Sequence, residues 1–293
     1  MVAEEPHEYI LGGSATELDR IHGFHDSTVD HIGKLVLAPV DFVASGGRRL
    51  RILDSGTAAG RWLQDLRDEQ GSQHEYIGTD ITESFFPSAS SQATRNQDRE
   101  EGGDAGIVYK TQDVTQPWPA DWAASFDLVH QRFVLGAVRS EQLEDVVANL
   151  VALVKPGGWI QLMESDVGAP VIGEKDNAAA VVWGLLRKIY LTMGVEPDVD
   201  THLSAYFARA GLVDVSEQRI VVPIGKRRAD VDMGRRSAET VALTAQQLVM
   251  GAKHVGVAEL DKMDLNDLPS KVLRGLEEYG GTYSVYVIMG RKP

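Results

Sequence analysis

The sequence predicts an α/β protein with a parallel, doubly wound sheet, and three observations support this fold class. Short apolar runs alternate with helical stretches over residues 50–165, which is the order that produces successive β-α-β units. The apolar runs end on or close to polar residues. The first run also leads into a loop with two glycines four residues apart, in the sequence RILDSGTAAGRWL. Such a loop suits either a tight strand-to-helix turn or a ligand that lies against bare backbone.

The chain before the first apolar run is predicted to be helical. Apolar residues recur at helical spacing from Thr16 to about Ala44. We expect two helices in this segment, or one helix that is broken near Gly23.

The elements of the sheet follow in chain order. Strands are expected at 50–54, 75–80, 107–113, 126–132 and 159–165, the last of them after a Pro-Gly-Gly turn. Helices are expected at 61–70, closed by Gly71, and at 140–154, where Ser140 is placed as the N-terminal cap. The polar, glycine-rich stretch 88–106 is predicted to be a surface loop.

The remainder of the chain is predicted to cover the sheet rather than to fold independently. Helices are expected over 177–193 and 202–211, strands over 213–225 and 282–292, and mostly helical structure over 226–275. We therefore expect one domain over residues 1–293. It comprises an N-terminal helical cover (1–46), a cofactor-binding core (47–166), and a helical cap with the last two strands (167–293).

Composition and charge exclude several classes of protein. The 293 residues carry 29 basic and 43 acidic side chains, a formal net charge of −14, which disfavours a nucleic-acid partner. The chain has no cysteine, so thiolate catalysis and thiolate metal sites are excluded. The start, MVAEEPHEYI, lacks the pattern of a secretory signal, and no apolar run is long enough to cross a membrane. We expect a soluble, cytoplasmic protein.

The polar residues at the strand ends form a pattern that suits a nucleoside. They are Asp54, Asp80, Asp113, the pair His130 and Gln131, and Glu164. The carboxyl ends of parallel strands meet at one edge of the sheet, where ligands bind in doubly wound folds. Asp80 follows Gly60 by twenty residues and could accept hydrogen bonds from a ribose diol, while Asp113 could receive an adenine amino group. The loop reads G-x-x-x-G rather than G-x-G-x-x-G, so the glycines alone are a weak signal.

At these residues the chain resembles the class I S-adenosylmethionine-dependent methyltransferases, in particular the group found in fungal secondary metabolism. The segments that carry the resemblance are ILDSGTAAG, YIGTDI, QDVTQPWPADWAASFDLVHQRFVL and LVKPGGWIQLMESD, with YILGG and ELDRIHGFHD before them and YSVYVIMGRKP after them. Together they extend over most of the chain. They are specific for the family and not for a substrate.

The resemblance implies a Rossmann-like methyltransferase fold with seven strands, the last antiparallel to the others, and S-adenosylmethionine as the cofactor. It implies that Gly56 and Gly60 flank the methionine part of the cofactor, with Asp54 near its amino group. Asp80 would bind the ribose hydroxyls, and Ile81 would lie against the adenine. The other implied cofactor-binding residues are Asp113 and Val114 at the adenine edge, and His130 and Gln131 near the sulfonium.

One residue departs from the family pattern. Ala58 stands where the first motif commonly has glycine. Alanine favours φ below zero and adds a methyl group near the cofactor, so we expect the loop to follow a variant path, to bind cofactor weakly, or to serve another purpose.

Methyl transfer is an in-line displacement, for which the protein mainly aligns the reactants and excludes water. A hydroxyl acceptor is helped by a base, and the candidates are His25, His130 and Glu164. The alternatives are a solvated helix histidine for His25, a structural histidine for His130, and an ion pair with Arg132 for Glu164. No metal is required or expected. The helix at 177–193 is where this fold would build an apolar acceptor pocket.

The sequence therefore predicts methyl transfer to a small molecule, most readily a secondary metabolite, at oxygen with nitrogen next. The expected partners are this acceptor and no nucleic acid or membrane, and the protein is expected to be a monomer or a homodimer. Two alternatives remain. One is a methyltransferase-like cyclase or pericyclase, suggested by Ala58, and the other is a methyltransferase-like regulatory protein.

Overall fold

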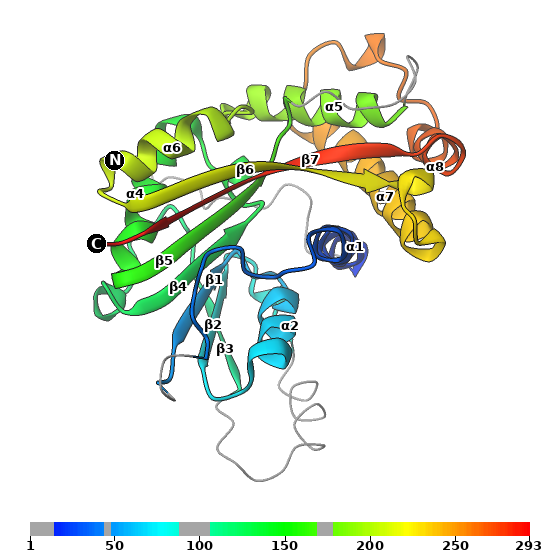
Figure 1. The fold of residues 1–293 in the computed structure, drawn as a ribbon. Helices are drawn as coiled ribbons and strands as arrows, with labels where there is room; N and C mark the ends of the chain where they lie inside the picture. Colours follow the sequence, from blue (N-terminus) through cyan, green and yellow to red (C-terminus); the bar gives the residue numbers. More distant parts are fainter. Residues whose placement is uncertain (1–14, 44–47, 88–105, 169–177) are drawn as a thin grey trace.

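The computed structural model describes residues 15–43, 48–87, 106–168 and 178–293. Most of the surface loop predicted at 88–106 lies outside these ranges. A seven-stranded sheet organises the molecule, in the order β3-β2-β1-β4-β5-β7-β6 (Figure 1). The strands are β1 (Arg51–Ser55), β2 (Glu75–Asp80), β3 (Ile107–Thr111), β4 (Phe126–Arg132), β5 (Val154–Ser165), β6 (Val213–Ile224) and β7 (Gly281–Arg291).

The directions of the strands confirm the predicted fold class. Strands β1 to β5 pair in parallel, and β7 runs antiparallel to both of its neighbours, β5 and β6. The first five strands consequently present their carboxyl ends at one edge of the sheet, which we call the carboxyl edge. In register, Asp54 lies beside His130, and Ser55 lies beside Gln131.

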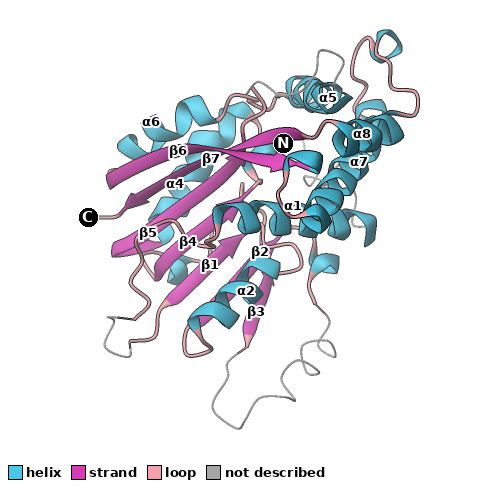
Figure 2. Cartoon of the chain, turned by 45° about the vertical axis from the view of Figure 1, so that its right-hand side comes forward, coloured by secondary structure: helices cyan, strands magenta, loops and turns pink. Residues whose placement is uncertain are grey.

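Helices cover both faces of the sheet (Figure 2). They are α1 (Ala15–Ile32), α2 (Arg61–Gln70), α4 (Leu143–Leu153), α5 (Ala178–Met193), α6 (Asp200–Arg209), α7 (Val231–His254) and α8 (Leu268–Glu278). Successive side chains of β4 point to opposite faces of the sheet, as in any β-strand. Leu128 packs in a cluster with Trp62 of α2, whereas Val129 packs in a cluster with Leu150 of α4.

The N-terminal segment forms one helix, so the prediction of two helices, or of a break near Gly23, is wrong. Helix α1 runs unbroken through Gly23, and the chain after Ile32 is irregular as far as Phe42. A side chain at Gly23 would meet Thr240 Oγ1 of α7 at 2.0 Å. The glycine is thus a contact point between two crossing helices and not a helix breaker, which the local sequence could not reveal.

The predicted cap of the helix at 140–154 is also wrong. Residues Ser140–Gln142 form a single 3₁₀ turn, and α4 begins at Leu143 with no side-chain cap. The Ser140 hydroxyl instead donates to the carbonyl oxygen of Gly194, 2.9 Å away. The Ser140 hydroxyl therefore binds a residue distant in sequence and does not cap the helix. Strand β5 also begins earlier than predicted, at Val154 directly after α4.

The segment after β6 contains the helices that cover the carboxyl edge. Asp230 caps α7 by accepting from the Met233 amide at 2.8 Å, and α8 follows before β7 closes the sheet. Buried residues of α5, α7, α8, β6 and β7 form one hydrophobic cluster, which also includes Phe24 of α1. This cluster attaches the helical cover to the antiparallel side of the sheet.

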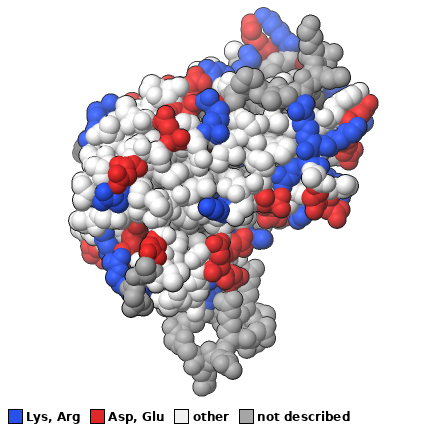
Figure 3. All heavy atoms as spheres, viewed as in Figure 1, with Lys and Arg blue, Asp and Glu red and all other residues white. Residues whose placement is uncertain are grey.

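Charged side chains of both signs share the surface. Figure 3 shows basic residues gathered toward the side where Figure 1 places α7 and α8, with acidic residues beside them. Ion pairs in this region include Arg235–Glu239 on α7 at 2.8 Å, and Lys271 of α8 with Asp264 of the preceding segment at 2.6 Å. Within the described ranges, no helix combines the length and the apolar composition that a membrane span needs.

Candidate active site

The loop between β1 and α2 needs its glycines for reasons internal to the chain. Gly56 and Gly60 adopt φ angles of 70° and 74°, a left-handed conformation that costs little only for glycine. A Cβ atom at Gly56 would lie 2.2 Å from Val134 Cγ2, and one at Gly60 would lie 2.1 Å from the Tyr109 hydroxyl. Backbone shape and close neighbours therefore account for both glycines without a ligand.

Ala58 does not adopt the negative φ that was expected of an alanine at this position. Its φ is 47°, so the residue keeps the left-handed conformation in which glycine is at ease. Its amide donates to Asp80 Oδ2 at 2.9 Å. Contacts with the end of β2 hold the loop in shape, and the alanine carries the resulting strain.

Replacing Ala58 by glycine is expected to stabilise the protein by about 1 kcal/mol, because the left-handed penalty of an L-residue disappears. Urea unfolding of Ala58→Gly against the parent chain measures the difference. The matched control is Ala123→Gly, at a position with φ −56°, where glycine brings no relief and costs entropy. Equal or lower stability of Ala58→Gly would show that the loop is not strained.

Asp54 organises the start of the loop and the end of β4. Its Oδ2 accepts from the Thr57 hydroxyl at 2.7 Å, and its Oδ1 lies 2.7 Å from His130 Nδ1. Since an ionised carboxylate only accepts hydrogen bonds, Nδ1 carries the proton and Nε2 of neutral His130 carries the lone pair. The ring stacks on Trp62 with centroids 3.7 Å apart, and burial lowers the pKa of His130.

Asp80 sits beside the loop at the end of β2. Besides the Ala58 amide, it accepts from the Thr82 amide at 2.9 Å. Burial raises the pKa of Asp80, which marks a carboxylate that lacks water and benefits from further donors. Ile81, the next residue, is an exposed apolar side chain with 37% of its surface accessible. A ribose diol on Asp80 and an adenine face on Ile81 both suit this arrangement.

Two more of the predicted cofactor residues lie beyond β3. Asp113 Oδ1 accepts from both the amide and the hydroxyl of Thr115, at 2.8 and 2.7 Å. These bonds shape the turn and leave acceptor capacity on the carboxylate for an amino group. Val114 is partly buried against the cluster that contains Val129.

Gln131 leaves one buried hydrogen-bond donor at this edge without a partner among the described residues. Its Oε1 accepts from the Ser55 hydroxyl at 3.0 Å, which fixes the direction of the amide. Its Nε2 is buried and makes no hydrogen bond to any described residue. Buried donors without a partner are rare in folded proteins and call for an explanation. The acidic, amide and apolar groups at this edge thus fit the adenosine and amino-acid parts of the cofactor that the resemblance implies.

His25 is buried, so its interpretation as a solvated helix histidine is wrong. Only 2% of its surface is exposed. Arg132 Nη2 donates to His25 Nδ1 at 2.7 Å, so Nε2 carries the proton and donates to Asp65 Oδ2 at 2.8 Å. Burial lowers the pKa of His25. Both ring nitrogens are engaged, which leaves His25 no free lone pair for a catalytic base.

Glu164 does not pair with Arg132, contrary to the alternative that the sequence suggested. Its Oε1 accepts from the amides of Val134 and Leu135, at 3.1 and 3.0 Å, and so holds the short turn that follows β4. Only 3% of the residue is exposed. Burial raises the pKa of Glu164 to about 7, against the opposite effect of the amide donors.

Four aromatic side chains from distant segments meet near the end of β4, and the sequence did not predict this grouping. They are Phe24 of α1, Phe133, Trp183 of α5 and Tyr283 of β7, which we call the aromatic cluster. Tyr283 is central, with ring centroids 5.4 Å from Phe24 and 6.3 Å from Trp183. Phe133 lies 6.4 Å from Phe24 and has a φ of 58°, an unusual backbone conformation for an aromatic residue. Trp183 Nε1 is buried without a partner among the described residues.

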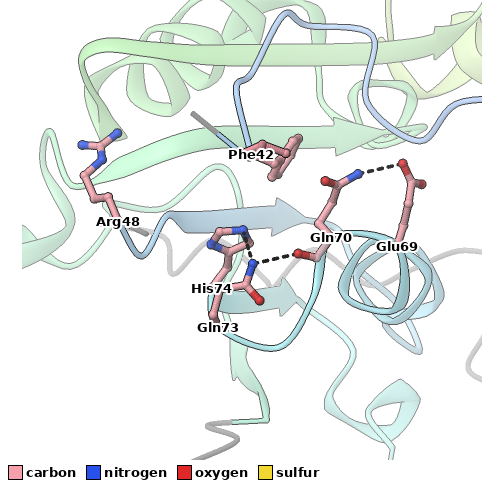
Figure 4. Close-up of a pocket in the computed structure, with 7 residues that line it drawn as sticks. Phe42, Arg48, Glu69, Gln70, Gln73 and His74 are labelled. Atoms are coloured by element: carbon pink, nitrogen blue, oxygen red, sulfur yellow. Dashed lines mark hydrogen bonds between the residues drawn. The ribbon is translucent and has the colours of Figure 1, made fainter. Parts of the chain in front are cut away.

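A pocket elsewhere does not compete with this site. The cavity of about 330 Å³ in Figure 4 is lined by Phe42, Val43, Arg48, Glu69, Gln70, Gln73 and His74. His74 precedes β2 and Arg48 precedes β1, so the pocket lies at the amino ends of these strands. Within the described ranges, no group of three or more histidine, aspartate and glutamate side chains is arranged to hold a metal ion.

Comparisons with known proteins agree with the resemblance. The profile of the family described as "Methyltransferase domain" matches residues 53–160. The chain is 32% identical to methyltransferase psoC of Aspergillus fumigatus over 96% of both chains. It is 33% identical to N-methyltransferase verN of Clonostachys rogersoniana, over 87% of this chain and 86% of the relative. N-methyltransferase sirN of Leptosphaeria maculans is 28% identical over 97% and 95%, respectively.

Proposed function

We infer the reaction from the family: this chain belongs to the class I S-adenosylmethionine-dependent methyltransferases, and we propose that it methylates a nitrogen atom of a small secondary metabolite. The similarity to proteins named N-methyltransferases, over most of the length of each chain, carries the proposal. It favours nitrogen over oxygen, which the sequence had placed first.

Different residues at the carboxyl edge would bind different parts of the cofactor. Asp80 and Ile81 would hold the ribose and the adenine, Asp113 and Val114 the adenine edge, and Gln131 would meet a polar atom with its free amide. When bound, S-adenosylmethionine supplies a methyl group activated by a positively charged sulfur. The protein's part is to align the acceptor with that methyl and to keep water away.

The aromatic cluster is our proposed contact surface for the acceptor. It lies where α1, α5 and β7 meet the residue that follows β4. Aromatic side chains supply large apolar contact areas, and the Trp183 indole N–H, which has no partner among the described residues, offers one directional hydrogen bond. These features suit a planar, largely apolar molecule with a carbonyl or hydroxyl group.

His130 is our proposed base for the proton that methylation displaces from nitrogen. Asp54 holds its Nδ1 proton, which orients Nε2 as the acceptor. The lowered pKa keeps the imidazole neutral at neutral pH and ready to accept a proton. His25 lacks a free nitrogen, and Glu164 Oε1 is held by two backbone amides of the turn after β4.

Incubation of the purified protein with S-adenosylmethionine and a panel of amines, amides and phenols is expected to yield N-methylated products. Mass spectrometry identifies the product and the methylated atom. Methylation of phenols alone would show that nitrogen is the wrong atom. Cofactor binding without any methyl transfer would favour the cyclase or the regulatory alternative instead.

Variants at two histidines test the base in the same assay. His130→Gln is expected to lower kcat by roughly 10²- to 10⁴-fold, the usual contribution of a positioned base. The matched control is His74→Gln, since His74 is equally buried but lines the Figure 4 pocket, where its Nδ1 accepts from the Leu50 amide and its Nε2 lies 3.1 Å from the Gln73 side chain. Equal activity of the two variants would remove His130 from the mechanism.

A further inference from the structure

Arg132, the last residue of β4, carries a positive charge that no acid neutralises within the described part of the chain. Its single hydrogen bond there goes to His25 Nδ1, and no carboxylate lies within 4.0 Å of its guanidinium. Arginine stays charged at all physiological pH values. Burial lowers the pKa of Arg132, yet the residue keeps part of its surface accessible. A cation in such surroundings is stabilised by an anion that reaches it from outside the chain.

The bond to His25 orients this charge and does not cancel it. A neutral imidazole accepts from Arg132, while Asp65 accepts the proton on the other ring nitrogen. Asp65 also forms an ion pair with Arg61 at 3.0 Å, so the negative charge of Asp65 is already paired with another arginine. The arrangement holds the guanidinium in one position and leaves its remaining donors for another partner.

The nearest strand end supplies a charge of the opposite sign. Asp54 is in register with His130, and Arg132 follows His130 by two residues on the same face of the sheet. Among the charged groups around Arg132, Asp54 has the largest effect on its pKa, which it raises. The two groups form no ion pair with each other, because Asp54 binds Thr57 and His130. A carboxylate and a guanidinium held close but apart are complementary to a ligand that carries both charges.

We propose that Arg132 binds the carboxylate of the amino-acid end of S-adenosylmethionine, with Asp54 facing the ammonium group on the same carbon. The inference rests on the proposed function and assigns a further binding residue to its cofactor site. A guanidinium suits this task, since it presents paired donors to the two oxygens of a carboxylate. The acceptor molecule is the other conceivable source of a carboxylate here, and the experiment separates the two sources.

Calorimetric titration with two ligands tests the assignment. S-adenosylhomocysteine has the adenosine and the amino-acid end, whereas 5′-methylthioadenosine has the same adenosine and thioether without the amino acid. Arg132→Met is expected to weaken S-adenosylhomocysteine binding on the order of 30-fold or more, as for other buried charge pairs that lose one member. Binding of 5′-methylthioadenosine should stay within about twofold of the parent chain, since no contact to it is lost.

Three controls make the result specific to the guanidinium. Arg132→Lys should recover part of the lost affinity, because it restores the charge without the paired donors. Arg139→Met, on an exposed residue of the segment after β4, should bind both ligands like the parent chain. The melting temperature of ligand-free Arg132→Met should equal or exceed that of the parent, since an un-neutralised buried charge has been removed.

Other outcomes overturn the assignment. Equal losses for both ligands would mean that Arg132 supports the whole site and does not bind the carboxylate. Unchanged S-adenosylhomocysteine binding with a raised KM for the acceptor would place the anion on the acceptor. A parent chain that binds neither ligand would contradict the cofactor site itself, and with it the proposed function.

Discussion

Replacement of Asp80 by alanine is expected to weaken S-adenosylmethionine binding on the order of 100-fold or more, because two roles of one carboxylate disappear together. A hydrogen bond to a charged group contributes about 1.5–3 kcal/mol, and Asp80 would accept one from each ribose hydroxyl. The same side chain accepts from the amides of Ala58 and Thr82 and so ties the glycine loop to β2. Calorimetric titration of Asp80→Ala against the parent chain measures the loss.

Two further variants separate these roles. Asp80→Asn keeps an oxygen for the amides but loses the charge, and we expect it to bind more tightly than Asp80→Ala and more weakly than the parent. Glu83→Gln removes an exposed carboxylate three residues away and should leave binding unchanged. If Asp80→Ala bound the cofactor like the parent chain, the site at this edge would be wrong, whatever the chain's family.

Replacement of Glu164 by glutamine is expected to change how stability depends on pH. Glu164 has an ordinary pKa of 4.5 when unfolded and about 7 in the folded protein. An acid whose pKa is higher in the folded than in the unfolded protein stabilises the fold at pH values below its unfolded pKa. This stabilisation is lost as the pH rises through the folded pKa. Between about pH 4.5 and 8, the free energy of unfolding of the parent chain should therefore fall by on the order of 3 kcal/mol relative to that of Glu164→Gln.

Thermal unfolding of both proteins across this pH range measures the effect. Glutamine keeps an oxygen that accepts from the amides of Val134 and Leu135, so the turn after β4 should survive the substitution. Methyl transfer should survive as well, since our proposed base is His130 and not Glu164. Glu141→Gln, on an exposed residue, is the control and should melt in parallel with the parent chain. Parallel curves for Glu164→Gln would show that the amides keep the carboxylate ionised.

The predictions of the first four strands and of the sheet agree with the structure. The strands from β1 to β4 lie within two residues of the predicted bounds, and the sheet has the predicted order of directions. Alternation between short apolar runs and helices is a property of neighbouring residues, so one sequence is enough to recognise it. The polar residues at the strand ends meet at one edge for the same reason, because parallel strands align their carboxyl ends.

The partners of those residues could not be predicted in the same way. The sequence predicts a helix break near Gly23, yet this glycine makes room for Thr240 from a helix more than 200 residues away. The capping pattern predicts that Ser140 caps a helix, yet its hydroxyl donates to the carbonyl oxygen of Gly194. Spacing and propensity describe what a residue does alone, and long-range packing overrides them where helices cross.

The sequence by itself determined the fold class, the family, and the edge of the sheet where the polar strand ends meet. Only the tertiary structure decided the state of each group at that edge. Arg132 donates to His25 and does not pair with Glu164, and Glu164 accepts from backbone amides. Ala58 adopts a left-handed conformation. The physical reason is that charge state, strain and hydrogen bonding depend on burial and on neighbours brought together by folding, and a linear pattern contains neither.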